Sequence, residues 1–240
     1  MKPVPTPFKW LALVLSLAGI GLCFVFLKEQ DAAAGGALVR GLRLGIVACG
    51  LVGWFASQSL ISGRGPKDGP LGDGLHELFA PWHAYLEAHP RAADGVLIAS
   101  SACIDLLGVF LIAASIFGPS MQPFAALILL FLMRQACQAL CALPAPPGMI
   151  WRHPGFPSLL VTYDVANDFF FSGHTSIAVL GAIVAAGTCP WWVGVAAAVV
   201  ALGEATVVLV LRAHYTMDVF AAAVAAFCAH GLAQWLCPGL

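Results

Sequence analysis

The sequence predicts an all-α, polytopic bundle of transmembrane helices with six to seven spans. Of the 240 residues, 60% are hydrophobic and only 10% are charged, whereas a soluble domain carries about 25% charged residues. The mean hydropathy is +0.91, and several apolar runs approach the roughly 20 residues that a helix needs to cross the hydrocarbon core. The formal net charge of −1 and the lack of a basic run give no sign of a nucleic-acid partner. We therefore expect an integral, multi-pass membrane protein.

Seven runs have the composition of a membrane span: Phe8–Leu27, Leu44–Ile61, Val96–Phe117, Met121–Leu143, Phe170–Cys189, Trp191–Leu211 and Thr216–Leu236. The second run is the weakest because it contains GLVGWFASQS, and without it the count is six. The first run also fits a cleavable signal peptide, but its apolar stretch is long for one and we interpret it as an anchor. We divide the chain into an N-terminal anchor segment and linker, 1–43, and a membrane domain with the candidate catalytic residues, 44–240.

Two polar stretches join these spans. Within 62–95, the piece Leu75–Ala88 is amphipathic and predicts an interfacial helix. The Pro-rich stretch 144–169 cannot continue a helix, and we expect it to run over the surface into the next span. The first stretch also contains three histidines that we predict to be surface residues: His76, His83 and His89.

Two polar clusters stand at the start of predicted spans, NDFFFSGHTS and LRAHYTMDVF. Because two helices lie between them, an even number of crossings brings both clusters to the same membrane face. Ionisable groups beside hydrocarbon cost free energy and mark candidate functional sites. The candidate residues of the two clusters are Asp168, Ser172, Gly173, His174, Arg212, His214, Tyr215 and Asp218.

The residue types in these clusters suit proton transfer and nucleophilic attack. His214 and Asp218 are four positions apart, which places them on one helix face. A carboxylate there can fix the imidazole tautomer and make the other ring nitrogen a better nucleophile. His174 would face it as a second titratable group, and backbone N–H groups around Gly173 could receive an anion. A metal site built from two His and two Asp is the alternative, and we rank it lower; Cys137 and Cys141 are interpreted as packing residues.

The two histidine motifs resemble those of a known family. SGHT followed by HYTMD is similar to the pair of signatures in the sphingomyelin synthase family, within the wider type 2 phosphatidate phosphatase superfamily. Asp168 matches the aspartate six residues before the first histidine of those enzymes. Arg134, followed by LPAPPG with Pro144 ten residues later, is similar to a pattern in the plant phosphatidylcholine:diacylglycerol cholinephosphotransferases.

The departures from the superfamily pattern favour a transferase over a phosphatase. Val208 stands where the phosphatases have an arginine six residues before the histidine, and their Lys-and-Arg-Pro motif is not visible. Asn167 stands where sphingomyelin synthases usually have glycine, which leaves the headgroup and the acceptor open.

The resemblance implies a two-step headgroup transfer without a metal or organic cofactor. His214, oriented by Asp218, would attack the phosphorus of a phospholipid, and His174 would protonate the departing diacylglycerol oxygen. His174 would then deprotonate the acceptor, diacylglycerol or ceramide, which takes phosphocholine or phosphoethanolamine from the phosphohistidine. Arg134 or Arg212 would neutralise phosphate oxygens. The family likeness places the site on the periplasmic or lumenal side, whereas the loop charges lean mildly the other way.

Two acidic residues lie within predicted spans. Asp105 and Glu204 are candidates for contact with the substrate, because acids inside a membrane are functional candidates by default. A salt bridge between Asp105 and Arg134 is the structural alternative. Two other functions are possible with these residues. A lipid phosphatase or phospholipase C-like hydrolase would use the same two histidines, and a proton-coupled transporter would use Asp105, Glu204 and the histidines as a proton relay. The oligomeric state is left open.

Overall fold

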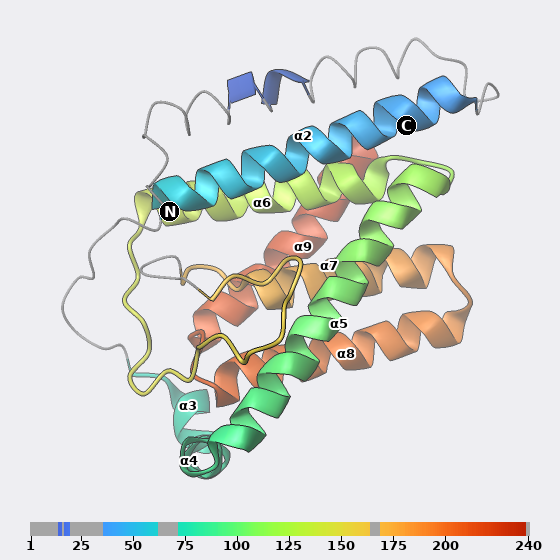
Figure 1. Ribbon diagram of the computed structural model, residues 1–240. Helices are drawn as coiled ribbons and strands as arrows, with labels where there is room; N and C mark the ends of the chain where they lie inside the picture. Colours follow the sequence, from blue (N-terminus) through green and yellow to red (C-terminus); the bar gives the residue numbers. More distant parts are fainter. Residues whose placement is uncertain (1–13, 16, 20–35, 62–71, 164–168, 239–240) are drawn as a thin grey trace.

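The computed structural model describes residues 14–15, 17–19, 36–61, 72–163 and 169–238. Within these described ranges, five helices are long and apolar enough to cross a membrane, and a shorter apolar helix accompanies them. The predicted polytopic α-helical bundle is therefore confirmed (Figure 1). Most of the predicted first span, Phe8–Leu27, lies outside the described residues. The helices are α2 (Ala37–Ile61), α3 (Gly74–Leu78), α4 (Ala80–Ala88), α5 (Pro90–Phe117), α6 (Gln122–Leu140), α7 (Gly173–Thr188), α8 (Trp191–Val210) and α9 (Thr216–Leu236).

Several helix ends differ from the prediction. Helix α2 begins at Ala37, so it runs across the predicted division at residue 43. Helix α5 begins at Pro90, six positions before the predicted Val96. Proline suits the first turn of a helix because its missing N–H would have no intrahelical partner there. The division of the chain into an anchor segment and a membrane domain stays a prediction.

Small residues let the helices of the bundle approach closely, as is common between membrane helices. Helix α7 packs along α8, and α9 packs against both α6 and α7. A Cβ atom added to Gly194 would lie 2.8 Å from the Cα atom of Ala186, so α7 and α8 meet almost backbone to backbone. Helix α9 buries a row of alanines: Ala222, Ala225, Ala226, Ala229 and Ala233.

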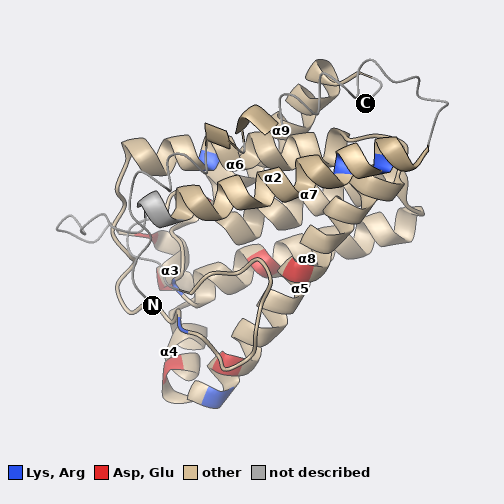
Figure 2. Cartoon of the chain, turned by 45° about the horizontal axis from the view of Figure 1, so that its top comes forward, with Lys and Arg blue, Asp and Glu red and all other residues tan. Residues whose placement is uncertain are grey.

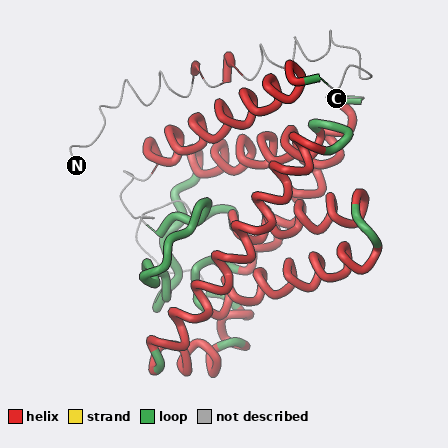
Figure 3. Tube along the Cα trace, turned by 45° about the vertical axis from the view of Figure 1, so that its right-hand side comes forward, coloured by secondary structure: helices red, strands yellow, loops and turns green. Residues whose placement is uncertain are grey.

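The long helices contain few charged residues, as Figure 2 shows. At the end away from α3 and α4, Arg43 Nη1 donates to the Gly118 carbonyl at 2.9 Å and so satisfies a backbone group just beyond α5. At the other end, the long loop between α6 and α7 folds over the helix ends (Figure 3). That second end is where the two histidine motifs lie.

Asp105 anchors this long loop to α5. Its carboxylate accepts hydrogen bonds from the Ser158 hydroxyl and from the backbone N–H groups of Leu159 and Leu160, all at 2.9 Å. These donors belong to the loop, and the salt bridge with Arg134 stays a prediction. The loop residues bring enough donors to satisfy the carboxylate by themselves.

The amphipathic piece forms α3 and α4, but two of its histidines are buried rather than exposed. His76 Nε2–H donates to the His214 carbonyl at 2.8 Å, and His83 Nδ1–H donates to the Val210 carbonyl at 2.9 Å. The prediction of surface histidines is wrong for these two, because both rings bond carbonyls around the turn between α8 and α9. His89 is exposed as predicted.

Candidate active site

A cavity of about 60 Å³ lies where the ends of α6 and α7 meet the turn between α8 and α9. His174, His214 and Arg134 all line it, together with Gly173 and Trp151. The predicted meeting of the two histidine motifs at one face is therefore present in the structure. Its other walls are largely apolar and include Trp54, Ile104, Phe131, Leu160, Phe169 and Ile177.

His214 is held in one tautomer by a backbone carbonyl. Its Nδ1 lies 2.8 Å from the oxygen of Phe169 and 3.6 Å from Asp218 Oδ2. A carbonyl oxygen can only accept, so Nδ1 carries the proton and Nε2 keeps a free lone pair. The sequence predicted Asp218 as the hydrogen-bond acceptor; in the structure Phe169 takes that place, and Asp218 acts on the ring as a nearby charge.

Asp218 also stabilises the start of α9. The side chain is fully buried, and Oδ2 accepts from the backbone N–H of Tyr215 at 2.8 Å. A carboxylate in the first turn satisfies an orphan N–H and interacts favourably with the helix dipole. The other oxygen, Oδ1, is buried and makes no hydrogen bond within the described part of the chain. One carboxylate thus holds the helix end and places negative charge behind His214.

His174 is the second residue of α7 and is almost entirely buried. The edge of its ring faces Trp151, with ring centroids 5.1 Å apart and planes at 86°. Its Nε2 is buried and has no hydrogen-bond partner among the residues that the structure describes. A buried polar atom without a partner is costly, which makes this nitrogen a candidate for contact with a substrate oxygen.

Arg134 lies beside Gly173 at the start of α7. Its Nε donates to the Phe171 carbonyl at 2.9 Å, and the guanidinium is buried. A Cβ atom added to Gly173 would lie 3.6 Å from Arg134 Nε, an ordinary van der Waals distance, so the guanidinium lies directly against the first residue of α7. The cavity therefore holds a fixed positive charge next to both histidines.

Ser172 joins the two motifs through its backbone and caps α7 with its side chain. Its hydroxyl accepts from the N–H and the hydroxyl of Thr175 at 3.2 and 3.1 Å. Its own N–H donates to the Asp218 carbonyl at 3.2 Å. This predicted substrate ligand is fully buried and occupied by the helix cap, and a further role in binding stays a prediction.

Four other predicted residues that the structure describes do not line the cavity. Glu204 is buried between α8 and α5, where the Ser100 hydroxyl donates to it at 2.6 Å. Arg212 adopts a φ of 53° and donates from Nη1 to the Pro147 carbonyl at 3.1 Å. Tyr215 is buried beside His76, with ring centroids 5.7 Å apart. Asp105 anchors the loop, and Asp168 lies outside the described residues.

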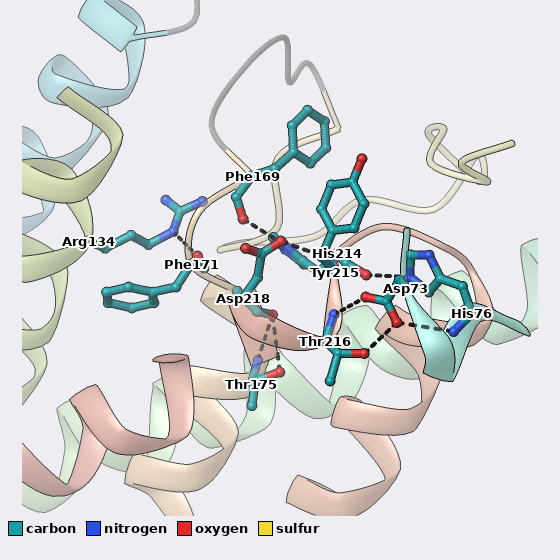
Figure 4. A network of polar contacts seen from close by, with 11 residues as sticks. Asp73, His76, Arg134, Phe169, Phe171, Thr175, His214, Tyr215, Thr216 and Asp218 are labelled. Atoms are coloured by element: carbon teal, nitrogen blue, oxygen red, sulfur yellow. Dashed lines mark hydrogen bonds and ion pairs between the residues drawn. The ribbon is translucent and has the colours of Figure 1, made fainter. Parts of the chain in front are cut away.

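Asp73 and His76 belong to the same network, and the sequence reasoning missed both (Figure 4). Asp73 accepts from the N–H groups of Leu75 and His76 at the start of α3, and from the N–H and hydroxyl of Thr216 at the start of α9. Burial alone would raise the pKa of Asp73, but the hydrogen bonds from Thr216 and His76 together lower it below its ordinary value. An aspartate directly before a helix is an N-cap signal that the sequence does contain.

Comparison with known families supports a membrane enzyme of the phosphatase and phosphotransferase class. Residues 166–235 match the family model described as PAP2 superfamily C-terminal. The matched segment contains both histidine motifs, and it supports the type 2 phosphatidate phosphatase-like superfamily. No curated protein and no solved structure matched the chain significantly. Among the described residues, no group of three or more His, Cys, Asp or Glu side chains is placed to hold a metal ion.

Proposed function

We propose that the protein transfers a phospho-alcohol headgroup from a phospholipid to an acceptor lipid through a phosphohistidine. The observation that carries this proposal is the convergence of His174, His214 and Arg134 on one cavity, with His214 held so that Nε2 is its free nitrogen. Two imidazoles and a guanidinium can supply a nucleophile, a proton carrier and a phosphate ligand. The donor lipid and the acceptor would both reach the cavity from the membrane.

In the first step, His214 Nε2 attacks the phosphorus and the bond from phosphorus to the diacylglycerol oxygen breaks. His174 gives its proton to that oxygen, so diacylglycerol leaves as an alcohol. Because Nδ1 keeps its proton, the phosphorylated ring is cationic, and the Asp218 carboxylate 3.6 Å away stabilises it. The anionic phosphodiester favours the protonated form of His174 and pairs with Arg134.

In the second step, His174 removes the proton from the acceptor hydroxyl. The acceptor oxygen attacks phosphorus, the N–P bond to His214 breaks, and the ring returns to its neutral tautomer. His174 gives up one proton in the first step and takes up one proton in the second, so its protonation state is restored at the end of the cycle. The transfer therefore balances without a cofactor. Splitting the exchange in two lets each lipid occupy the cavity in turn.

The position of Val208 favours transfer over hydrolysis. It stands where the phosphatases of the superfamily have an arginine, and its side chain is fully buried in α8. Its carbonyl accepts from the N–H of Ala213 at 2.8 Å, within the tight turn that leads to His214. The second cation of a monoester phosphatase is therefore replaced by an apolar side chain. Hydrolysis by a phosphatase or phospholipase C-like reaction is the second candidate.

We further propose phosphocholine or phosphoethanolamine as the headgroup, diacylglycerol or ceramide as the acceptor, and a site that faces the periplasm or lumen. Trp151 and Tyr163, with ring centroids 5.1 Å apart, form an aromatic wall beside His174. Such a wall suits the cationic end of either headgroup. The sphingomyelin synthase likeness supports the same choice.

The test uses the purified full chain in mixed micelles with headgroup-labelled phosphatidylcholine or phosphatidylethanolamine. Diacylglycerol or ceramide is the acceptor, and His174→Ala, His214→Ala and the control Cys137→Ala are compared. Label in a new lipid, lost in both histidine variants and kept in the cysteine variant, supports the proposal. Water-soluble label released without an acceptor identifies a hydrolase. Proton-dependent flux that survives His214→Ala, without lipid turnover, identifies a transporter.

A further inference from the structure

A second cavity, which we call the apolar slot, lies between α2, α5 and α6 and has a volume of about 140 Å³. Its walls come mainly from these three helices, with Leu17, Leu160 and Ile177 added from other segments, and they are almost entirely hydrocarbon. Helix α2 lies outside the segment that matches the family model, so nothing in that match accounts for the slot. The residues used below to define it are Gly50 and Trp54 of α2, Ile112 of α5, and Phe124 and Gln135 of α6.

The apolar slot adjoins the cavity that holds the two histidines. Trp54, Phe131, Leu160 and Ile177 line both of them. A ligand with one end near His214 can therefore continue into the slot past the ring of Trp54. The two spaces differ in chemistry, because the first holds two imidazoles and a guanidinium and the second is apolar.

The register of the three helices gives the slot a direction. The histidine cavity touches residue 58 of α2, residue 104 of α5 and residue 134 of α6, and the slot extends to residues 50, 112 and 124. At 1.5 Å per residue these shifts correspond to about 12, 12 and 15 Å along the helix axes. The slot thus descends from the site by about half of the roughly 30 Å hydrocarbon core. That depth fits the acyl chain of a lipid in one leaflet.

Two buried donors lie where the slot begins. Trp54 Nε1 and both polar atoms of the Gln135 amide are buried and have no hydrogen-bond partner within the part of the chain that the structure describes. Both residues line the slot, and Gln135 directly follows Arg134. Buried N–H groups without partners cost free energy unless something binds them. A carbonyl oxygen at the head of an acyl chain is the acceptor that these donors lack.

We propose that the apolar slot binds one acyl chain of the donor phospholipid, and that Trp54 and Gln135 donate to the carbonyl that joins this chain to the glycerol. The inference deepens the proposed function, since it names how the donor lipid is held while its phosphate meets His214. The slot ends where the backbone of Gly50 packs against the Phe124 ring. This contact is so close that a Cβ atom added to Gly50 would lie 2.8 Å from the ring. Chain length and the ester linkage would both be recognised by residues outside the histidine motifs.

The first experiment measures binding without turnover. The purified full chain in mixed micelles is photolysed with a phosphatidylcholine whose acyl chain ends in a diazirine, and labelled peptides are mapped by mass spectrometry. We expect labels near Gly50 and Phe124, and Ile112→Phe should reduce them about tenfold because it removes room for about two methylenes. Val109→Phe, one turn away at a position that is 48% exposed, is the matched control and should leave them unchanged.

The second experiment compares the labelling of the unmodified protein by ester-linked and by ether-linked phosphatidylcholine. This comparison does not depend on whether a variant folds. A site built to bond a carbonyl rejects an analogue that lacks it. We expect about tenfold weaker labelling with the ether lipid. Trp54→Phe, which keeps the aromatic ring, and Gln135→Leu should each reduce this preference.

The outcomes separate the inference from the proposed function. If the slot is labelled but the protein transfers no headgroup, the acyl site is supported and the proposed reaction is overturned. Labels confined to outward-facing side chains, unaffected by Ile112→Phe and equal for ester and ether lipids, would overturn the acyl site even if headgroup transfer is found.

Discussion

Replacement of Asp73 by alanine is the sharpest test of how α3 supports the candidate active site. The carboxylate accepts from the N–H groups of Leu75 and His76 at 3.0 and 3.2 Å, and from the N–H and hydroxyl of Thr216 at 2.6 Å each. The change removes a helix cap, which costs about 1 kcal/mol. Losing the two partly exposed bonds to Thr216 adds about 1 kcal/mol, so unfolding should become easier by about 2 kcal/mol in total.

The same substitution should slow the reaction. His76 donates to the backbone carbonyl of His214, and Asp73 fixes the helix that carries His76. When this support is lost, the imidazole of His214 shifts relative to the phosphorus, and a misplacement near 1 Å can cost about a hundredfold in rate. We expect kcat to fall about tenfold to a hundredfold with little change in KM, measured as headgroup transfer in mixed micelles at pH 7.

Asp73→Asn separates the two functions of the carboxylate. Its single side-chain oxygen can still cap α3, while its NH₂ group faces the N–H of Thr216 and cannot accept from it. The loss in stability should therefore be about 1 kcal/mol, half of that for alanine. Asp94→Asn is the control, because the ion pair of Asp94 with Arg152 lies at the surface and should contribute less than about 1 kcal/mol.

The pH dependence follows from the lowered pKa of Asp73. A group with a pKa below its ordinary value stabilises the fold above that ordinary value, 3.8 here, and loses this contribution as the pH falls through the lowered pKa. The difference between wild type and Asp73→Ala should therefore be constant from pH 5 to 8 and shrink in acid. Wild-type stability and rate in both Asp73 variants at pH 7 would refute the argument that α3 supports His214.

Three further substitutions test other parts of the structure. Asp218→Asn should keep the fold, since its amide oxygen can still accept from Tyr215. In the proposed reaction kcat should fall about a hundredfold, because the proposed cationic phosphohistidine loses its counter-charge. An unchanged kcat would contradict this. Asp105→Ala should destabilise the protein by about 2 kcal/mol, because the loop N–H groups that it satisfies lose their acceptor, and thermal unfolding in detergent measures this. Glu204→Gln should transfer headgroups within about twofold of wild type, since the amide oxygen still accepts from Ser100. Loss of headgroup transfer in that variant would contradict this expectation and support a contact between Glu204 and the substrate.

The meeting of the two histidine motifs could be predicted because it depends on local information. Hydropathy marks the spans, and an even number of crossings between His174 and His214 brings them to one face. The helical spacing of His214 and Asp218 also predicted a short distance, and the 3.6 Å between His214 Nδ1 and Asp218 Oδ2 agrees with it. What spacing could not show is that a backbone carbonyl, that of Phe169, would take the hydrogen bond of the ring.

The burial of His76 and His83 could not be read from the amphipathic pattern. That pattern describes which face of a short helix is apolar, and it says nothing of a partner more than a hundred positions away in the chain. In the structure both rings bond carbonyls near the turn between α8 and α9, 138 and 127 positions distant. A histidine at an interface and a histidine in a structural network have the same local sequence.

By itself, then, the sequence determined a helical membrane protein with two histidine motifs at one membrane face, because apolar length and helical spacing are properties of neighbouring residues. Only the tertiary structure decided which groups surround these motifs. The Asp73 carboxylate accepts hydrogen bonds from Thr216, the Asp105 carboxylate holds the long loop, and an apolar slot forms between α2, α5 and α6. The hydrogen bonds of Asp105 to the loop and of Asp73 to Thr216 join residues 53 to 143 positions apart. Their geometry comes from how the helices pack, which no local pattern of residues encodes.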